Sequence, residues 1–245
     1  MDRKVFTHVI ANFVLVVLVF AIATIGFVGA TTNVFSSNDN APIYRGSGEK
    51  QVSLMVNVYW GTEYIDDMLA IFDKYNVTTT FFVGGSWVAQ YPDMLVKIAS
   101  HGHEIGNHGY FHKEHSKLSY DNNVKEIVSC GKLVFEYIGT DMTLFAPPGG
   151  DFNSNTLAAA RDNGYKTIMW SRDTIDWRDK DSDTVYTRAT KDTSSGELIL
   201  MNPTAHTRDA LEKIVKYYVD AGYSIVPVST NIGEIWTSTN STRAD

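Results

Sequence analysis

Between residues 51 and 232 the chain alternates between short apolar runs and longer segments in which apolar residues recur every three or four positions. The short runs are typical of buried strands and the longer segments of amphipathic helices. Strands are predicted at residues 52–58, 78–83, 104–105, 143–145, 167–170, 198–201 and 224–226. Helices are predicted at 63–75, from an N-cap at Ser86 towards residue 100, and at 119–138, with others between the later strands. This order predicts βα units and a parallel sheet, although periodicity alone does not separate a barrel from an open doubly wound sheet.

Residues 9–30 form an almost unbroken apolar run that follows a short charged segment containing Arg3 and Lys4. Such a run is long enough to cross a bilayer as a helix, and the basic residues before it favour a cytoplasmic N-terminus. The alternative is a cleaved signal peptide, for which the small residues at 28–30 offer a cleavage site. We favour an uncleaved anchor, because the run is longer than the apolar region of most signal peptides.

The predicted protein is therefore a single-pass cell-membrane protein whose C-terminal domain is extracytoplasmic. Its predicted parts are a cytoplasmic N-terminus (1–8), a transmembrane anchor (9–30), a polar linker (31–50), one α/β domain (51–232) and a polar tail (233–245). The formal net charge is −7 and no basic run is present, so nucleic acid is not an expected partner. The single cysteine, Cys130, excludes an internal disulfide and is predicted to be a small buried residue of a helix.

A histidine-rich stretch at residues 101–112 carries the first candidate chemistry. His108 and His112 are four positions apart, so on a helical turn their rings would share one face. Two imidazoles placed in this way are half of a plausible Zn, Co or Ni site. The alternative is that they are surface histidines of a loop, or that they cap a turn.

The sequence Gly-His-Glu-Ile-Gly-Asn-His-x-x-x-His at residues 102–112, read after an apolar strand, resembles the second motif of the NodB-type polysaccharide deacetylases of carbohydrate esterase family 4. Counterparts of all five family motifs occur in order between residues 52 and 228. The resemblance implies an irregular, partly open (β/α) barrel of about seven parallel strands, with each motif at the end of a strand. It also implies that His108 and His112, together with an aspartate, hold a divalent metal.

The first motif departs from the family pattern at the two positions that matter most for catalysis. The family reads Thr-Phe-Asp-Asp-Gly, in which the first aspartate is the base and the second is the third metal ligand, whereas this chain has Tyr59 and Trp60 there. A phenol with an ordinary pKa of about 10 is a poor base near neutral pH, and an indole has no lone pair for a metal. The base and one ligand are therefore lost together.

The later motifs are partly kept. Ala146 stands in place of the family arginine and Asn202 in place of the family histidine, which acts as the acid; Asn202 cannot deliver a proton in that role. Gly109 stands where the family has Ser or Thr. His206, four residues after Asn202, is a disfavoured alternative for the acid, because a loop between strand and helix would direct it elsewhere. The fourth motif survives in residues 173–177. Candidate catalytic residues are Glu63, Asp173 and Asp176, although Glu63 also fits a structural role in the first turn of a helix.

Two functions follow from the resemblance. The first is a protein of the deacetylase fold that binds N-acetylated cell-wall glycan, such as peptidoglycan, with weak or lost deacetylase activity. The alternative is an active, metal-dependent N-deacetylase with a nonstandard third ligand and base. The altered first motif favours the former, and divalent metal binding is then weak or absent. The altered first motif also resembles a sporulation-associated subgroup, and a protein of the envelope or spore coat is an alternative partner that the sequence does not identify. The expected glycan-binding residues are Tyr59, Trp60, Tyr110, Pro148, Trp177 and Asn202, with Phe111 beside them.

Overall fold

The centre of the fold is β1 (Gln51–Val58), in which every residue but the first is buried. The computed structural model describes residues 41–234. The even-numbered side chains of β1 pack against the surrounding helices in one apolar cluster, whereas Met55 belongs to a second cluster with Phe82 of the neighbouring strand. β1 therefore has a layer of side chains on each side, as expected for a strand of a parallel sheet covered on both faces.

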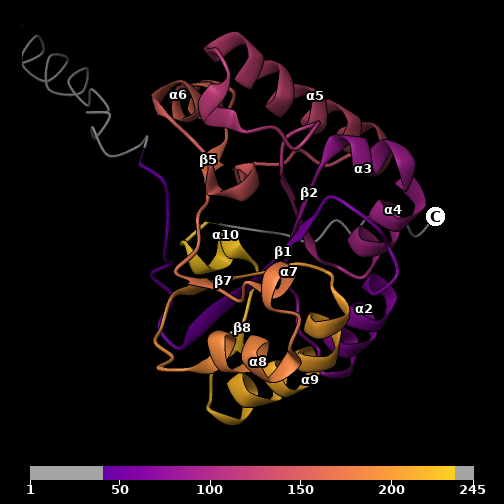
Figure 1. Ribbon diagram of the computed structural model, residues 1–245, viewed down its shortest axis with the longest axis vertical. Helices are drawn as coiled ribbons and strands as arrows, with labels where there is room; N and C mark the ends of the chain where they lie inside the picture. The colour runs from indigo at the N-terminus through magenta and orange to yellow at the C-terminus, as the bar shows by residue number, and fades with distance from the viewer. Residues whose placement is uncertain (1–40, 235–245) are drawn as a thin grey trace, which may run out of the picture. The chain divides into compact units, whose positions relative to one another are not determined.

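The described residues form eight strands that pair only in parallel. Besides β1 they are β2 (Thr80–Val83), β3 (Glu104–Asn107), β4 (Leu144–Phe145), β5 (Lys166–Thr167), β6 (Arg172–Asp173), β7 (Glu197–Met201) and β8 (Ser224–Ile225). The order β5-β4-β3-β2-β1-β7-β6 leaves two open ends, and β8 pairs with the start of β1 (Figure 1). The strands form a half-barrel, which confirms the predicted α/β class. Between a barrel and an open doubly wound sheet, the structure is a partly open barrel.

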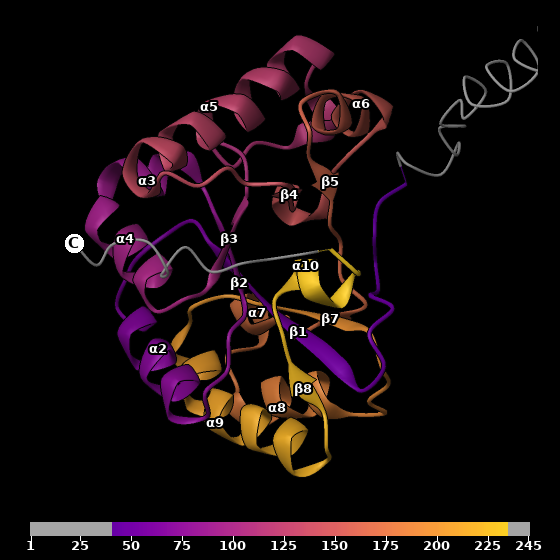
Figure 2. The same cartoon turned by 180° about the vertical axis from the view of Figure 1, so that it is seen from behind.

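Nine helices accompany the sheet in the described range, most of them packed on the outer apolar cluster, whereas Val228 of the last one lies in the inner cluster. They are α2 (Ile65–Lys74), α3 (Gly85–Gln90), α4 (Pro92–Ser100), α5 (Tyr120–Ile138), α6 (Ser154–Asp162), α7 (Asp176–Asp179), α8 (Ser182–Thr190), α9 (Ala205–Asp220) and α10 (Val228–Asn231), with 3-10 turns η1 (His115–Lys117) and η2 (Pro148–Gly150). The longest, α5, begins where the Ser119 hydroxyl accepts from the Asn122 N–H and ends at a left-handed Gly139. Seen from behind, α10 lies beside β1 and β8 (Figure 2).

Two local predictions are wrong. The helix predicted from Ser86 towards residue 100 is two helices, because Pro92 has no N–H to donate and disfavours a helical conformation at Tyr91. Ser86 lies inside α3 and is not its N-cap, which is Gly84. The strand β6 was also not predicted, since two polar residues, Arg172 and Asp173, carry no strand pattern.

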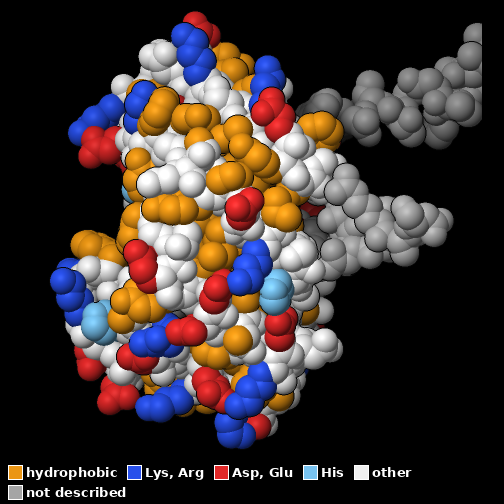
Figure 3. All heavy atoms as spheres, turned by 90° about the vertical axis from the view of Figure 1, so that its right-hand side faces the viewer, with side chains coloured by type: hydrophobic (Ala, Val, Ile, Leu, Met, Phe, Trp, Pro, Cys, Tyr) orange, Lys and Arg blue, Asp and Glu red, His pale blue; other side chains and the backbone are white. Residues whose placement is uncertain are grey.

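Ion pairs between exposed side chains join α2 to its neighbours. Lys97 of α4 lies 2.9 Å from Asp66, and Arg208 of α9 lies 2.8 Å from Asp67. On the face shown in Figure 3, Lys and Arg side chains are interspersed with Asp and Glu. Each such exposed pair contributes only about 0–1 kcal/mol to the free energy of unfolding, so the apolar cluster beneath holds these helices.

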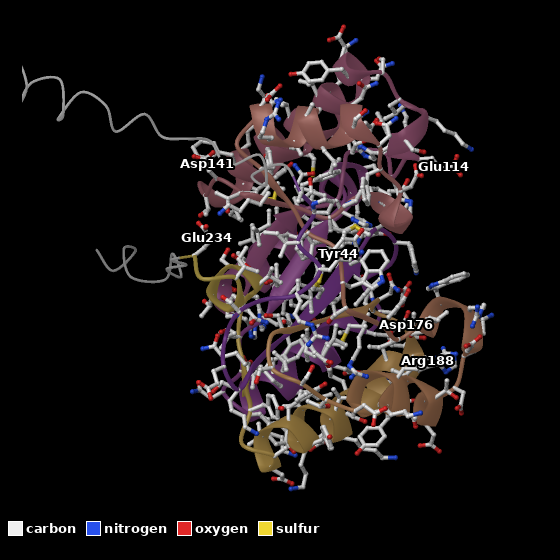
Figure 4. The ribbon with its side chains drawn as sticks, turned by 90° about the vertical axis from the view of Figure 1, so that its left-hand side faces the viewer. Tyr44, Glu114, Asp141, Asp176, Arg188 and Glu234 are labelled. Carbon is white, nitrogen blue, oxygen red and sulfur yellow. The ribbon has the colours of Figure 1, made fainter. Side chains whose placement is uncertain are left out.

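The folded domain begins before the predicted boundary at residue 51. Ile43 forms a parallel bridge with Ile168, next to β5, and Arg45 forms an antiparallel bridge with Glu197 at the start of β7. We call residues 43–45 the strap, because they connect the residue that follows β5 with the start of β7; Tyr44 is seen in front of the strands in Figure 4. Ile43 packs on the inner apolar cluster, which explains why this part of the predicted linker is held on the domain.

The predicted anchor at residues 9–30 and most of the predicted tail at 233–245 lie outside the described residues, so they stay predictions. Between residues 41 and 234, no helix combines the length and apolar character needed to cross a membrane. Cys130 is fully buried in α5, as predicted, and its thiol lies 3.3 Å from the Val83 carbonyl at the end of β2. Burial raises the pKa of this thiol to about 12.

Candidate functional site

The candidate site lies where five parallel strands end at one edge of the sheet. The residues that follow directly are Tyr59 and Trp60 after β1, Gly84 after β2, His108 after β3, Ala146 after β4 and Asn202 after β7. The backbone N–H groups of Gly84, His108 and Ala146 each donate to the last carbonyl of the neighbouring strand, at 2.9–3.0 Å. The changed family positions therefore share one edge with His108, as the resemblance implied.

His108 is buried, with 2% of its surface exposed, and its ring orientation is fixed. Its Nδ1 lies 2.7 Å from the Ala146 carbonyl oxygen, which can only accept, so Nδ1 carries the proton and donates. The lone pair of the neutral ring is then on Nε2. Burial and, secondarily, the neighbouring His112 lower the pKa of His108 to about 3. His108 is therefore a neutral imidazole with one nitrogen available.

His112 lies next to His108, but on a loop. The two ring centroids are 5.1 Å apart with an edge-to-face angle of 65°, so the predicted proximity is confirmed. The rings do not meet on a helical turn, because residues 108–114 form no helix and His112 has a φ of 51°, in the left-handed region. Burial lowers the pKa of His112 as well.

Tyr59 stacks on His112. The ring centroids are 4.3 Å apart at an interplanar angle of 28°, and the Tyr59 hydroxyl donates to the Phe111 carbonyl at 3.4 Å. A Cβ added to Gly84 would lie 2.8 Å from the Tyr59 ring, so this ring also packs closely on the end of β2. The residue at the family's base position is therefore a contact of a histidine ring and is held from two sides.

The histidine loop is held from below by Glu126 of α5, a residue that sequence analysis missed. Its carboxylate accepts from the backbone N–H groups of Tyr110 and Phe111, at 3.0 and 2.7 Å, and pairs with Lys113 at 3.1 Å. Only 5% of Glu126 is exposed. A signal was present, since position 126 falls beside the apolar face of the helix, where a carboxylate has to find partners.

Asp176 is occupied by structural hydrogen bonds. It is 1% exposed and accepts from the Asn202 backbone N–H at 2.6 Å and from Asn202 Nδ2 at 2.7 Å. The hydroxyl of Thr207, in the first turn of α9, donates to it too. Figure 4 shows Asp176 and Arg188 on the part of the molecule formed by α7 and α8. Asp176, in α7, thus connects this helix to Asn202 at the end of β7 and to Thr207 in α9.

The other two candidate carboxylates are not brought together with the histidines by any contact among the described residues. Asp173 is half-buried, and its Oδ1 accepts from the Ile175 N–H at 2.8 Å; burial raises its pKa. Glu63 is exposed and folds back on its own turn, accepting from the Thr62 N–H at 3.0 Å. Glu63 precedes α2, which begins at Ile65, so its predicted place in the first turn of a helix is wrong; its carboxylate instead binds the backbone of its own turn.

The predicted glycan-binding residues differ in accessibility. Trp60 and Trp177 are 48% and 57% exposed, and Phe111, beside the histidines, is 55% exposed. Tyr110 is half-buried and packs against the backbone of Gly85 in α3. Pro148 is buried, so its ring offers little surface to a ligand. The aromatic surface at the site is therefore formed by fewer residues than predicted.

The donor set does not fit the three-ligand metal centre that the family implies. Two imidazoles are present, but Trp60 supplies no lone pair and Tyr59 lies against one of the imidazoles. In the described range 41–234, no three His, Cys, Asp or Glu side chains are grouped as metal ligands would be. His115, three residues after His112, is buried, with its Nδ1 2.7 Å from Asn123 Oδ1 and its Nε2 without a hydrogen-bond partner among the described residues.

Comparison with known proteins agrees with the fold. Residues 45–168 match the family model for polysaccharide deacetylases. The chain is 37% identical over 194 residues to the uncharacterized protein YlxY of Bacillus subtilis, covering 79% of this chain and 61% of YlxY, about three fifths of that relative's length. It is 32% identical over 172 residues to a peptidoglycan-N-acetylglucosamine deacetylase of Bacillus cereus, covering 68% of this chain and 80% of the relative.

A solved structure with a similar fold is that of BA3943 from Bacillus anthracis, described as a CE4 family pseudoenzyme. It superimposes with a TM-score of 0.77 at 33% identity and covers 80% of this chain and 70% of its own. A mutant of that protein, described as having restored enzymatic activity, superimposes with the same TM-score at 32% identity, over 80% of this chain and 72% of its own. Together with the family model, these matches establish that the chain belongs to the polysaccharide deacetylase family.

Proposed function

We propose that this protein binds N-acetylated cell-wall glycan through a deacetylase fold and has weak or absent deacetylase activity. The observation that carries the proposal is the contact between Tyr59 and His112, whose ring centroids are 4.3 Å apart. The position that holds the base in the family is occupied here by a ring that packs on a family metal ligand. The fold and the edge where the strands end are those of the family, but the base and the acid needed for hydrolysis are replaced by Tyr59 and Asn202.

Amide hydrolysis needs a base to activate water and an acid for the leaving amine. Tyr59 is a weak base near neutral pH, and the Asn202 amide already donates to Asp176. Each acid–base contribution is worth about 10²–10⁴ in rate, so losing both lowers turnover by several orders of magnitude. The alternative of an active enzyme requires a new base, and Glu63, Asp173 and Asp176 all have other hydrogen-bond partners.

The glycan class is proposed from two supports. Exposed Trp60 and Trp177 offer the flat apolar faces on which sugar rings pack, and Phe111 adds a third. Relatives include a peptidoglycan-N-acetylglucosamine deacetylase of Bacillus cereus, whose substrate is an N-acetylated glycan of this kind. The resemblance to a sporulation-associated subgroup stays a prediction, and no described residue bears on it.

The test combines an activity assay with a binding assay. The full protein is incubated with acetylated chitooligosaccharide and with peptidoglycan, with and without added Zn²⁺, Co²⁺ or Ni²⁺, and released acetate is measured. Its retention on insoluble peptidoglycan is measured in parallel. The proposal expects retention without measurable acetate release. Rapid acetate release would support the alternative enzyme, and a lack of both would refute glycan binding.

Trp60→Ala and Trp177→Ala should each weaken retention on peptidoglycan by about 3- to 10-fold, because an aromatic contact is worth about 0.5–1.5 kcal/mol beyond its buried area. The matched control is Phe135→Ala, since Phe135 is 47% exposed but lies near the C-terminal end of α5, away from the strand ends. Dissociation constants from sedimentation with peptidoglycan measure the effect. If all three variants bind peptidoglycan equally well, neither Trp60 nor Trp177 belongs to the glycan-binding surface.

We also propose that residues 9–30 anchor the protein in the cell membrane with the folded domain outside the cytoplasm. The support is the length and apolar character of this run and the basic residues before it. The full chain is expected in the membrane fraction after alkaline carbonate washing, and a chain lacking residues 9–30 in the soluble fraction. Release of the full chain by carbonate, or a shortened mature N-terminus, would instead indicate a cleaved signal peptide.

A further inference from the structure

We propose that Phe111 and Lys113, which the buried Glu126 holds on the histidine loop, form a recognition element for an anionic group carried by the glycan. The inference rests on the proposed glycan binding and adds a charge preference to it. The Phe111 ring packs on a sugar, and the Lys113 ammonium binds a carboxylate or phosphate attached to that sugar. Phe111 stands at a variable position of the motif His-x-x-x-His, and Lys113 follows the motif directly.

Phe111 is an exposed aromatic residue whose position is nonetheless fixed. Its N–H donates to Glu126 at 2.7 Å, and its carbonyl accepts from the Tyr59 hydroxyl at 3.4 Å. Its ring meets the Tyr110 ring edge to face, with centroids 4.6 Å apart, and still leaves 55% of the residue exposed. A ring held in this way loses little conformational freedom when a sugar packs on it, which favours binding.

The Lys113 ammonium lies beside this ring and is held there by two contacts. It is 5.2 Å from the centroid of the Phe111 ring and 3.1 Å from Glu126 Oε1. These contacts fix where the positive charge lies relative to the aromatic face. The Lys113 side chain is 52% exposed, and an ammonium has three N–H donors. Contact with one carboxylate oxygen therefore leaves donors for a second anion.

Glu126 does not present its negative charge to a ligand. Its Oε2 accepts from two backbone N–H groups of the loop, its Oε1 faces Lys113, and only 5% of it is exposed. A ligand that approaches from solvent therefore meets the ammonium first. The neighbouring pair of Lys117 and Glu114 differs, because these side chains are 73% and 62% exposed and the carboxylate is as accessible as the ammonium. Lys117 is therefore the matched control for Lys113.

The experiment titrates the full wild-type chain by calorimetry with three soluble disaccharides. One is neutral N,N′-diacetylchitobiose, the second is a phosphate ester of it, and the third is N-acetylglucosaminyl-N-acetylmuramic acid, which carries a carboxylate. An anionic disaccharide should bind about fivefold more tightly than the neutral one, as expected for one exposed ion pair, and added NaCl should reduce the difference. The anion that is preferred identifies the source of the charge.

Three variants assign this preference to Lys113. Lys113→Met should bind all three disaccharides equally, and Lys117→Met should keep the wild-type preference. Combining Lys113→Met with Glu126→Gln separates recognition from stability, because an amide oxygen can accept the same two N–H groups and no buried carboxylate is left without a cation. This double variant should recover the unfolding temperature that Lys113→Met loses, but not the preference for an anion.

The inference fails if wild type binds neutral and anionic disaccharides equally, or if the preference survives Lys113→Met or disappears in Lys117→Met. It also fails if the double variant recovers the preference. If Lys113→Met does not fold, the double variant alone is held to the loss of preference. If wild type binds none of the three sugars, the proposed glycan binding itself fails, which is a different result from binding without a charge preference.

Discussion

Combining Tyr59→Asp, Trp60→Asp and Asn202→His should turn this protein into a measurable deacetylase, with acetate release at least about 10⁴-fold above wild type. The first change supplies a carboxylate base, and the third an imidazole acid, each worth about 10²–10⁴ in rate. The second offers a carboxylate beside His108 and His112, the ligand that the present donor set lacks. Acetate release from chitooligosaccharide with added Zn²⁺ or Co²⁺ measures the result.

The structure suggests why Asn202→His should be accepted. The Asn202 side chain now donates to Asp176 at 2.7 Å, and an imidazole N–H at that position has the same carboxylate available as an orienting partner. Ala146→Arg is added only in a second step, because Ala146 is fully buried and a guanidinium there has to displace apolar neighbours. Trp60→Asp alone serves as the control and should stay inactive. If the triple variant folds, binds Zn²⁺ and still releases no acetate, the lost activity has causes beyond these three positions.

Acidification should destabilise the protein through His103, a buried histidine of the loop before β3. Burial, and secondarily His101, lower its pKa from 6.5 to about 4. Below pH 6.5 the unfolded chain binds a proton at His103, whereas the folded state binds it only near pH 4. The free energy of unfolding therefore decreases as the pH is lowered from about 6.5 to 4. The contribution reaches about 1.4 kcal/mol per pH unit, or about 2 kcal/mol between pH 7 and pH 5. Denaturant unfolding at several pH values measures it.

The matched variant is His103→Gln, whose amide oxygen can still accept from the Thr79 N–H that now donates to His103 Nδ1 at 3.1 Å. Relative to this variant, wild type should lose about 2 kcal/mol on going from pH 7 to pH 5. Glu104 has the opposite sign, because burial raises its pKa and the folded state then binds the extra proton; it is present in both proteins and cancels. Parallel stability curves for the two proteins would show that His103 does not titrate in this window.

The sequence predicted the fold well where a continuous pattern determines the element. β1 is an unbroken apolar run, and α5 has an N-cap serine, an apolar face and a terminal glycine, so both were located to within one residue. β6 was missed because it is only two residues long. It is defined by its pairing with β7, and its own residues carry no strand pattern. The strap was read as linker, since its few apolar residues find partners only in distant parts of the chain.

The candidate site was predicted less completely for a related reason. The motif order located the histidine pair after β3, where the structure has a loop, but the four-residue spacing does not define how the two rings meet there. The stack of Tyr59 on His112 joins residues more than fifty positions apart, and no local pattern encodes it. Asp176 resembled a catalytic carboxylate in sequence, whereas its partners come from later in the chain: Asn202 directly follows β7, and Thr207 lies in α9.

The position of the strap constrains the order in which the domain can be assembled during synthesis. Arg45 leaves the ribosome before every strand of the sheet, yet it hydrogen-bonds to residues 194 and 195, and its contact with Ser195 spans 150 positions. Contacts of such high sequence separation form late, because most of the chain has to be in place first. The strap therefore cannot form its contacts with residues 194–197 until the start of β7 has been made. In a nascent chain, the inner apolar cluster is also incomplete throughout that interval, because its members Leu198 and Val228 belong to β7 and α10.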